Sequence, residues 1–249
     1  MNTRSIFLLT LVICMILQAC THQAGPGEIT TLPDFSAYQD VKVKKKAFFD
    51  FMRPIIQSEN ARVAAKRAQM LALKEKLDLG TPLNPREYQW LKALADEFSV
   101  ALPDSNDIKA WKILNRRVDI VPYRLALAQS AKESAWGTSR FARQGLNMFG
   151  MWCFSKGCGI VPAQRATNMT HEVAVYPSIN ASVAAYLRSI NRVDMYTPLR
   201  KLRHKIVKEG NKPTAIELAE KLTGYSERGE PYVSEIQAII RSNQKLMGG

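Results

Sequence analysis

The stretch that decides the fold is YRLALAQSAKESAWG, residues 123–137. Its first half contains four successive apolar residues, Leu125 to Ala128, so a helix formed here has no polar stripe. A helix that is apolar on every side is buried in the centre of a domain, and this segment is therefore predicted to be the central helix. The helix is expected to end near Gly137, which leaves Glu133 at the open end of a buried element.

Most of the remaining chain also shows helical patterns. Apolar residues recur at helical spacing in segments that proline, glycine and asparagine separate. A helical pattern begins at Val41, and besides the central helix further helices are predicted over residues 58–79, 88–98, 108–118, 179–190, 214–224 and 231–240. Residues 145–177 differ, because glycines and a proline divide them into short runs, which favours short strands or a hairpin. The predicted fold class is α+β, mainly helical, with a small β-hairpin insertion.

The N-terminus has the pattern of a bacterial export signal. The apolar run over residues 6–17 is too short to span a bilayer comfortably but fits a signal-peptide core. It closes on LQAC at residues 17–20, which resembles a lipobox, so residues 1–19 are predicted to be removed and Cys20 to be lipidated. Thr21 follows in place of the aspartate that commonly marks inner-membrane retention, which favours the outer membrane, facing the periplasm. The alternative is an ordinary cleavage site with an incidental cysteine.

The exported part is predicted to have three regions. Residues 20–40 are polar and show no apolar periodicity, so they are expected to be a flexible tether. Residues 41–104 form a helical N-terminal region, in which Pro54 is expected to start or kink a helix. The break at residues 103–106 is taken as the main boundary, and residues 105–249 as the principal domain.

Composition narrows the class of protein. The chain has 249 residues, of which 46% are hydrophobic, so dominant disorder is excluded. A formal net charge of +13 predicts an anionic partner, either nucleic acid, a membrane surface or an acidic polymer. Four cysteines and three histidines are too few for a disulfide-dense miniature or a multi-site zinc protein. No His-Glu-x-x-His, P-loop or dinucleotide motif occurs, so no metal or cofactor is expected.

Glu133 is the first candidate for chemistry. Its neighbours are small or aromatic, with Trp136 three residues on, and a carboxyl group at the end of a buried helix is partly desolvated. Desolvation raises the pKa of a carboxyl group, which is what a general acid needs near neutral pH. Glycoside hydrolysis requires such an acid to protonate the departing sugar oxygen. The alternative is a surface carboxylate at a helix end.

The sequence around Glu133 resembles a known family. AQSAKESAWGTS at residues 128–139, with NMFG at residues 147–150, is similar to the signature of the peptidoglycan glucosaminidases, a lysozyme-like group of endo-β-N-acetylglucosaminidases. One branch of the family shares further short motifs over nearly all of the mature chain. These are KAFFDF (46–51), WCF (152–154), GCGIVP (157–162), HEV (171–173), YL (186–187) with Asn191, and RGEPY (228–232). The resemblance implies a lysozyme-like catalytic domain over residues 105–249.

The resemblance also implies roles for individual residues. Glu133 matches the family's catalytic glutamate. Trp136 and Asn147 lie in the site-forming motifs, and Phe149 and Trp152 lie in the motifs that follow, so these four side chains are expected to contact the substrate.

A second catalytic group is harder to assign. Tyr225 lies where related enzymes have a site tyrosine, but Ser-Glu-Arg follows it at residues 226–228 in place of the usual Ala-Thr-Asp. Many family members have a second acidic residue in the β region, and here the segment after Pro162 offers only Glu172 before the next helix. The second step therefore uses Glu172, another group, or the N-acetyl oxygen of the substrate itself.

Two cysteines lie close together in the predicted β region. Cys153 and Cys158 are five residues apart, and in an oxidising compartment they are predicted to form a disulfide that stiffens one wall of the cleft. A metal site with His171 as the third ligand is the weaker alternative, because zinc sites usually have a second pair of ligands.

These observations predict a membrane-anchored peptidoglycan hydrolase that cuts glycan strands at the β-1,4 bond after N-acetylglucosamine, with Glu133 as general acid. One alternative is a lytic transglycosylase, which also works with a single glutamate but forms an anhydromuramic end. Another is a non-catalytic, glycan-binding envelope lipoprotein. Nucleic-acid binding is disfavoured by the export signal and by the absence of a recognition motif.

Overall fold

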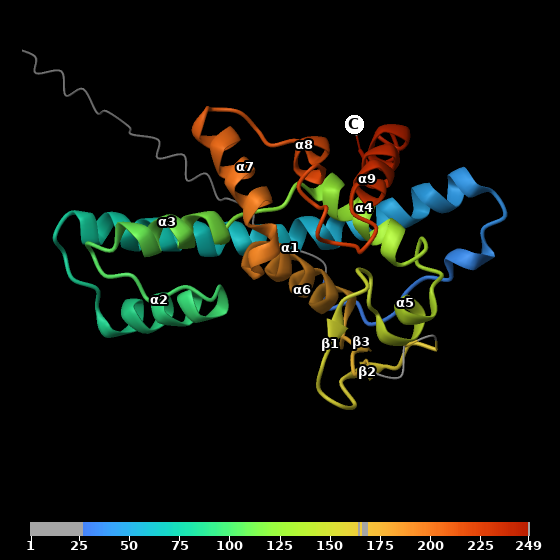
Figure 1. The fold of residues 1–249 in the computed structure, drawn as a ribbon, viewed down its shortest axis with the longest axis horizontal. Coiled ribbons are helices and arrows are strands. Elements are labelled where there is room, and N and C mark those ends of the chain that lie inside the picture. The colour runs from blue at the N-terminus through green and yellow to red at the C-terminus, as the bar shows by residue number, and fades with distance from the viewer. Residues whose placement is uncertain (1–26, 164, 166–168, 249) are drawn as a thin grey trace, which may run out of the picture.

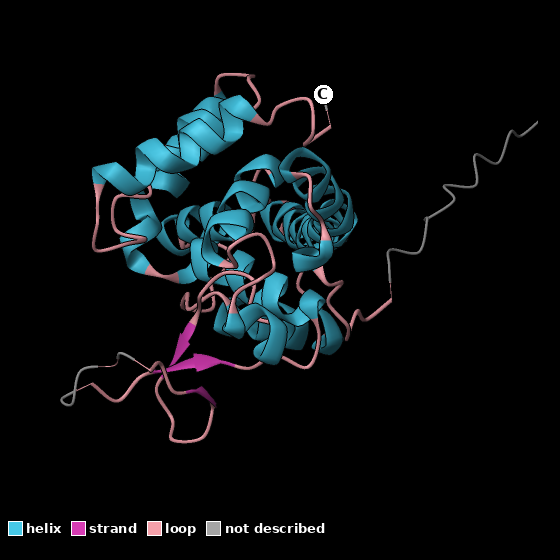
Figure 2. Cartoon of the chain, turned by 90° about the vertical axis from the view of Figure 1, so that its right-hand side faces the viewer, coloured by secondary structure: helices cyan, strands magenta, loops and turns pink. Residues whose placement is uncertain are grey.

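The computed structural model describes residues 27–163, 165 and 169–248. One long helix, α1, runs through the helical body (Figure 1), and a small sheet, drawn in magenta, lies at its edge (Figure 2). The elements are η1 (Phe35–Ala37), α1 (Val41–Asp78), α2 (Pro85–Glu97), α3 (Ile108–Arg117), α4 (Tyr123–Glu133), α5 (Arg140–Gly145), β1 (Trp152–Cys153), β2 (Gly159–Ile160), β3 (Glu172–Ala174), α6 (Ile179–Arg192), η2 (Asp194–Tyr196), α7 (Thr197–Lys208), α8 (Ala215–Ala219) and α9 (Glu230–Ser242). The predicted α+β class, mainly helical, is confirmed.

α1 is a single helix of 38 residues. Asp40 caps it by accepting a hydrogen bond from the Val43 N–H at 2.8 Å. Pro54 lies inside the helix, so no helix starts there. An interior proline removes one backbone hydrogen bond, but the buried side chains on both sides of it hold the helix in the core. None of the described helices is long and apolar enough to cross a membrane.

α1 contributes to two hydrophobic cores. Its first half packs with α4, α6, α8 and α9 in the larger core, and its second half packs with α2 and α3 in a smaller one. Figure 1 shows α2 and α3 together at one end of α1. The boundary predicted at residues 103–106 lies between α2 and α3, which share the smaller core, so it does not divide two separately packed units. Pro103 lies in the connection between two helices that pack in the same core.

The segment before α1 is packed against the body, and this corrects the prediction of a tether for residues 27–40. The N–H of Ile29 donates to Asn180 Oδ1 at 2.9 Å, and the Ile29 carbonyl accepts from the Ile179 N–H at 2.8 Å. Phe35 is 1% exposed and packs edge-on against Phe48. A single buried aromatic residue leaves no periodicity for sequence reasoning to detect. The predicted signal and Cys20 lie outside the described residues.

The β region is a three-stranded antiparallel sheet in the order β1-β3-β2. Trp152 of β1 and Ile160 of β2 both stand opposite Val173 of β3, so the strands on either side are joined through β3 and do not pair as a hairpin. Gly159 is required in β2, because a Cβ there would lie 2.1 Å from the Val173 carbonyl oxygen. The sheet holds Trp152 at a fixed place beside the helical body.

Candidate active site

The candidate active site is built on the end of α4. Every residue from Leu125 to Ala131 is buried, which confirms that this is the central helix. α4 ends at Glu133, whose side chain is partly buried and lines a cleft. Ala135 and Trp136 follow in the left-handed conformation, with φ of 50° and 59°. This turn stops the helix directly after Glu133, at the edge of the core.

Burial raises the pKa of Glu133 above its ordinary value. A hydrogen bond from Tyr232 and the charge of Lys132 act against this shift, and the nearby carboxylate of Glu235 adds to it. The direction is the one that the sequence predicted. The balance favours the protonated carboxyl group, which is the form that a general acid needs.

A buried hydrogen-bond chain leads to Glu133. The Tyr186 hydroxyl donates to Gln129 Oε1 at 2.7 Å, and Gln129 Nε2 donates to the Tyr232 hydroxyl at 2.9 Å. Tyr232 in turn hydrogen-bonds to the carboxyl group of Glu133. Because the Tyr232 oxygen already accepts from the amide, its proton is directed at Glu133. The chain therefore fixes the carboxyl group in position.

Asn147 organises the loop that passes over Glu133. Its side chain is buried, and all of its hydrogen-bonding groups have partners in the loop or in β3. Its Nδ2 donates to the carbonyl groups of Met151 and Ala174, both at 2.9 Å, and its Oδ1 accepts from the Phe149 and Met151 N–H groups. No part of the amide is left for a sugar. The substrate contact predicted for Asn147 is therefore replaced by a positioning role.

The same loop brings Phe149 and Gly150 to the cleft. Phe149 also lines the cleft, but its ring is buried and stacks on Tyr186 with centroids 4.0 Å apart. The ring therefore belongs to the core and is not exposed to a substrate. Tyr225 donates its hydroxyl to the Phe149 carbonyl at 2.9 Å. Burial holds the pKa of Tyr225 well above its ordinary value, so this hydroxyl stays protonated. This hydrogen bond anchors the loop that carries Phe149 and Gly150.

The cleft itself has a volume of about 820 Å³. Glu133 lies in it together with residues 149–152, the segment that leads into β3, η2 and residues 224–228. Trp152 is 48% exposed and lines the cleft, as expected of a substrate-binding aromatic residue.

Trp136 lies against α1, so the substrate contact predicted for it is wrong. It does not line the cleft but packs edge-on against Phe48 and Phe49 of α1, with ring centroids 5.7 and 5.2 Å away. Lys45 Nζ lies 5.0 Å from the centre of the indole ring. The left-handed turn after α4 directs Trp136 toward α1. The apolar surroundings of Glu133 therefore come from tyrosines of α6, η2 and α9.

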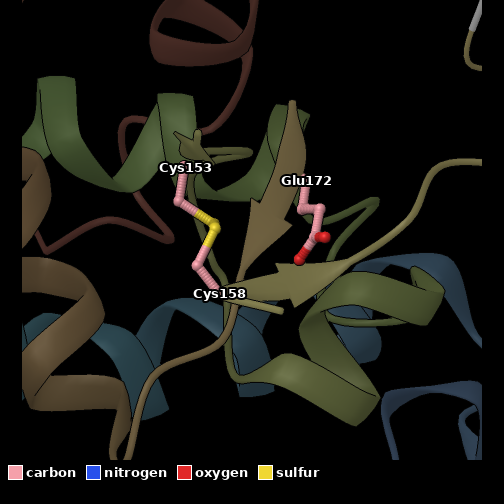
Figure 3. Close-up of side chains that lie close together, drawn as sticks. All are labelled: Cys153, Cys158 and Glu172. Atoms are coloured by element: carbon pink, nitrogen blue, oxygen red, sulfur yellow. A yellow bond between two sulfur atoms is a disulfide. The ribbon is translucent and has the colours of Figure 1, made fainter. Parts of the chain in front are cut away.

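Glu172 is also outside the cleft. Figure 3 shows its carboxylate beside the Cys153–Cys158 disulfide, which the structure forms as the spacing predicted. The carboxylate accepts the N–H groups of Gly157 and Gly159 at 3.0 and 2.7 Å, and these bonds lower its pKa. Glu172 therefore holds the disulfide loop, which argues against the catalytic role considered for it. The two cysteines and Glu172 come within 4.8 Å of one another, but disulfide sulfurs offer no thiolate to a metal.

Sequence reasoning did not identify several residues of the cleft. Glu227 is exposed and is the one carboxylate besides Glu133 that lines the cleft in the described part of the chain. Arg165 and Arg228 bring positive charge to the same cleft, and Tyr232 contacts Glu133. Two signals in the sequence pointed to residues 226–232, the departure from the family pattern at residues 226–228 and the RGEPY motif at residues 228–232, and none pointed to Arg165.

Comparison with known proteins assigns the chain to a glycosidase family. The family model described as glucosaminidase, mannosyl-glycoprotein endo-beta-N-acetylglucosaminidase, matches residues 108–245, and the chain belongs to this family. The chain is also similar to the protein bax of Escherichia coli (strain K12). The two are 31% identical over 226 residues, which is 91% of this chain and 79% of the relative. No solved structure matches the chain.

Proposed function

We propose that this protein is a peptidoglycan hydrolase, an endo-β-N-acetylglucosaminidase that cuts the β-1,4 bond after N-acetylglucosamine. The observation that carries the proposal is Glu133, a carboxyl group of raised pKa beside an open cleft of about 820 Å³. Membership of the glucosaminidase family supplies the reaction class. The aromatic wall and the cationic residues of the cleft suit a glycan that carries negative charge.

In this proposal Glu133 acts as the general acid. Its proton passes to the glycosidic oxygen as the bond from that oxygen to the sugar carbon breaks, and positive charge develops on the ring. The carboxylate left behind accepts the Tyr232 hydrogen bond and lies near the charge of Lys132, which stabilise it. A water molecule then adds to the sugar carbon and passes a proton to a carboxylate, which is that of Glu133 in a retaining route and a second carboxylate in an inverting one.

The group that assists the second step is either a protein carboxylate or the substrate's N-acetyl oxygen. Glu172 is replaced as the protein candidate by Glu227, since Glu227 lines the cleft and Glu172 does not. Glu227→Gln distinguishes the two routes. Loss of turnover with substrate binding retained assigns the step to Glu227, and unchanged turnover assigns it to the N-acetyl group.

We propose further that the enzyme is a lipoprotein of the cell envelope, anchored through Cys20 in the outer membrane and facing the periplasm. The support is the signal-like run and the lipobox-like LQAC at residues 17–20. Labelling cells with radioactive palmitate tests the anchor. Label incorporated by the wild type and lost in Cys20→Ala supports it, and equal label or none in both contradicts it.

Digestion of purified sacculi tests the activity. Wild type, Glu133→Gln and the exposed-carboxylate control Glu220→Gln are compared, and the products are separated and identified by mass spectrometry. Reducing N-acetylglucosamine ends, reduced roughly 10²–10⁴-fold in Glu133→Gln and unchanged in Glu220→Gln, are expected. Anhydromuramic ends would assign a lytic transglycosylase instead. Equal activity of wild type and Glu133→Gln, or none in either, would remove the proposed mechanism and favour a glycan-binding role.

A further inference from the structure

We infer that Trp152, His171 and Arg165 form a subsite for an amino sugar whose substituent carries a carboxylate. The three residues line the cleft on the side of the small sheet. The choice of an acidic amino sugar rests on the proposed function, but the subsite itself is argued from the contacts below. It gives the cleft a means of distinguishing peptidoglycan from an uncharged N-acetylglucosamine polymer.

Trp152 provides a rigid aromatic surface. Its ring stacks on the His171 ring with centroids 3.8 Å apart and planes within 13° of parallel. Its backbone is held by the pairing with Val173 and by the disulfide of the next residue, Cys153. One face of the indole is covered by the imidazole, yet 48% of the side chain remains exposed. A large, fixed and half-exposed aromatic ring in a cleft is suited to pack against the apolar face of a sugar ring.

His171 joins this aromatic surface to the rest of the cleft. It is 8% exposed, and its Nδ1 is buried without a hydrogen-bond partner among the described residues. Because this atom is shielded from solvent, His171 contributes to the subsite by holding the Trp152 ring in place, not through a hydrogen bond from Nδ1 to the sugar.

Arg165 supplies a cation that forms no ion pair with a described carboxylate, although its charge acts on Glu172 over a longer distance. Its Nη1 donates to the backbone carbonyl groups of His171 and Thr170, at 3.0 and 3.3 Å, so the guanidinium is fixed beside the aromatic pair. Among the described residues no carboxylate forms an ion pair with it, and the four neighbouring residues left undescribed, 164 and 166–168, contain no acid. The remaining N–H groups form the planar donor set that carboxylates bind best.

Arg228, the other arginine of the cleft, shows the contrast. Its Nη1 and Nη2 donate to the two carboxylate oxygens of Glu235 at 3.0 and 2.6 Å, so both terminal nitrogens already have a carboxylate partner, which Glu235 shares with Lys132. Arg165 is therefore the arginine of the cleft that is available to an anionic ligand. The aromatic surface and the free cation lie on the same wall and are joined through His171, which is the arrangement that a ring with a carboxylate-bearing substituent would use.

Two sources offer this chemistry. In a glycan without peptides, the lactyl group of N-acetylmuramic acid ends in a free carboxylate. In intact peptidoglycan that group is amidated, and the carboxylates belong to the stem peptide. Both are carboxylates attached through the muramoyl substituent, and binding measurements with defined fragments distinguish them.

The test uses the full chain carrying Glu133→Gln, so that binding is measured without turnover, and isothermal titration calorimetry gives the affinities. The three probes are chitotetraose, a peptide-free tetrasaccharide of alternating N-acetylglucosamine and N-acetylmuramic acid, and the same tetrasaccharide with stem peptides. The expected result is roughly tenfold tighter binding of at least one charged probe than of chitotetraose. The charged probe that gains affinity identifies the source of the carboxylate. Equal affinities for all three probes would overturn the subsite.

Four further variants are made in the same background. Trp152→Phe is expected to weaken the binding of all three probes, because phenylalanine offers a smaller aromatic surface. Arg165→Gln is expected to abolish the preference for the charged probe and leave chitotetraose unchanged, whereas Arg165→Lys keeps part of it. Lys156→Gln is the matched control, since it removes one exposed positive charge from the disulfide loop outside the cleft. Preference retained in Arg165→Gln, or lost equally in Lys156→Gln, contradicts the inference.

These binding measurements are independent of the sacculus digestion. If the digestion shows no reducing N-acetylglucosamine ends but the variants follow the expected pattern, the proposed activity fails and the subsite stands. If the digestion succeeds and Arg165→Gln behaves like Lys156→Gln, the subsite fails and the activity stands. Thermal unfolding of each variant verifies that it is folded before its affinity is interpreted.

Discussion

Gly150 lies directly against the carboxyl group of Glu133: a Cβ at Gly150 would stand 3.4 Å from Glu133 Oε2. The backbone of Gly150 is in the left-handed region, with φ of 64°. Both facts follow from the loop that Asn147 organises, and together they explain why glycine is required at this position. The open space above the carboxyl group is where the glycosidic oxygen would approach.

Gly150→Ala is therefore expected to lower activity more than stability. The left-handed backbone costs about 1–2 kcal/mol for an L-residue, and the new methyl group contacts the general acid. Gly80→Ala is the matched control, because Gly80 has φ of 75° and nothing within 4 Å of its Cβ position. Both variants should lose similar stability in urea, and only Gly150→Ala should lose sacculus digestion. Equal activity of the two variants would show that the space above Glu133 is not used.

Glu133→Gln should change how stability depends on pH. The pKa of Glu133 is raised in the folded state, so the folded protein binds more protons than the unfolded one at pH values above the ordinary glutamate pKa. Stability is therefore lost as pH rises through that window. Glutamine carries no charge, and the variant should gain stability relative to wild type as pH increases. Chemical denaturation at pH 4 and pH 8 measures this, and a constant difference between the two proteins would contradict it.

The upper limb of the pH–activity profile should move in Glu235→Gln. The Glu235 carboxylate raises the pKa of Glu133, and it also pairs with Lys132 at 2.6 Å, whose charge lowers that pKa. Removal of the carboxylate eliminates the first effect and frees the lysine for the second. The pKa of Glu133 should fall, so activity should be lost at a lower pH than in wild type. The shift should shrink at high salt, and Glu220→Gln should show none.

Tyr232→Phe should move the same limb in the opposite direction. The Tyr232 hydrogen bond lowers the pKa of Glu133, so its loss raises that pKa and extends activity to higher pH. The Gln129 amide also loses its acceptor in a buried environment, which should cost about 1–3 kcal/mol of stability. The pH–activity profile and urea unfolding check the two effects separately. A limb that moves to lower pH would contradict the assignment.

Asn147→Ala should destabilise the loop and reduce activity together. Two carbonyl groups and two N–H groups lose their partner, which should cost roughly 2–4 kcal/mol. Sugar binding by the cleft wall should persist at a temperature where the variant is folded, because Asn147 has no free group for the substrate. Loss of chitotetraose binding in a folded variant would contradict the positioning role and support the direct substrate contact predicted from the sequence.

The sequence predicted those features that depend on local pattern. The uniform apolar run of α4 has one physical solution, burial at the centre, and the residue at its end is then partly desolvated. The spacing of Cys153 and Cys158, in a chain predicted to be exported, predicted their pairing. Neither inference needed knowledge of which other elements surround these residues.

The partners of Glu133 were decided by the tertiary structure alone. Trp136 is three residues away in sequence, but the left-handed turn after α4 sends it to α1, while Tyr232 arrives from a helix 99 positions later in the chain. The tertiary structure also decided the role of Glu172. It is an acidic residue in the β region, but its carboxylate accepts hydrogen bonds from two glycine N–H groups and lies outside the cleft. Helical periodicity fixes which face of a segment is buried, but not which segments meet, because those contacts depend on packing between residues far apart in the sequence. The sequence by itself therefore determined the central helix and the partly buried carboxyl group at its end, and only the fold determined the groups that shift the pKa of Glu133 and the residues that line the cleft.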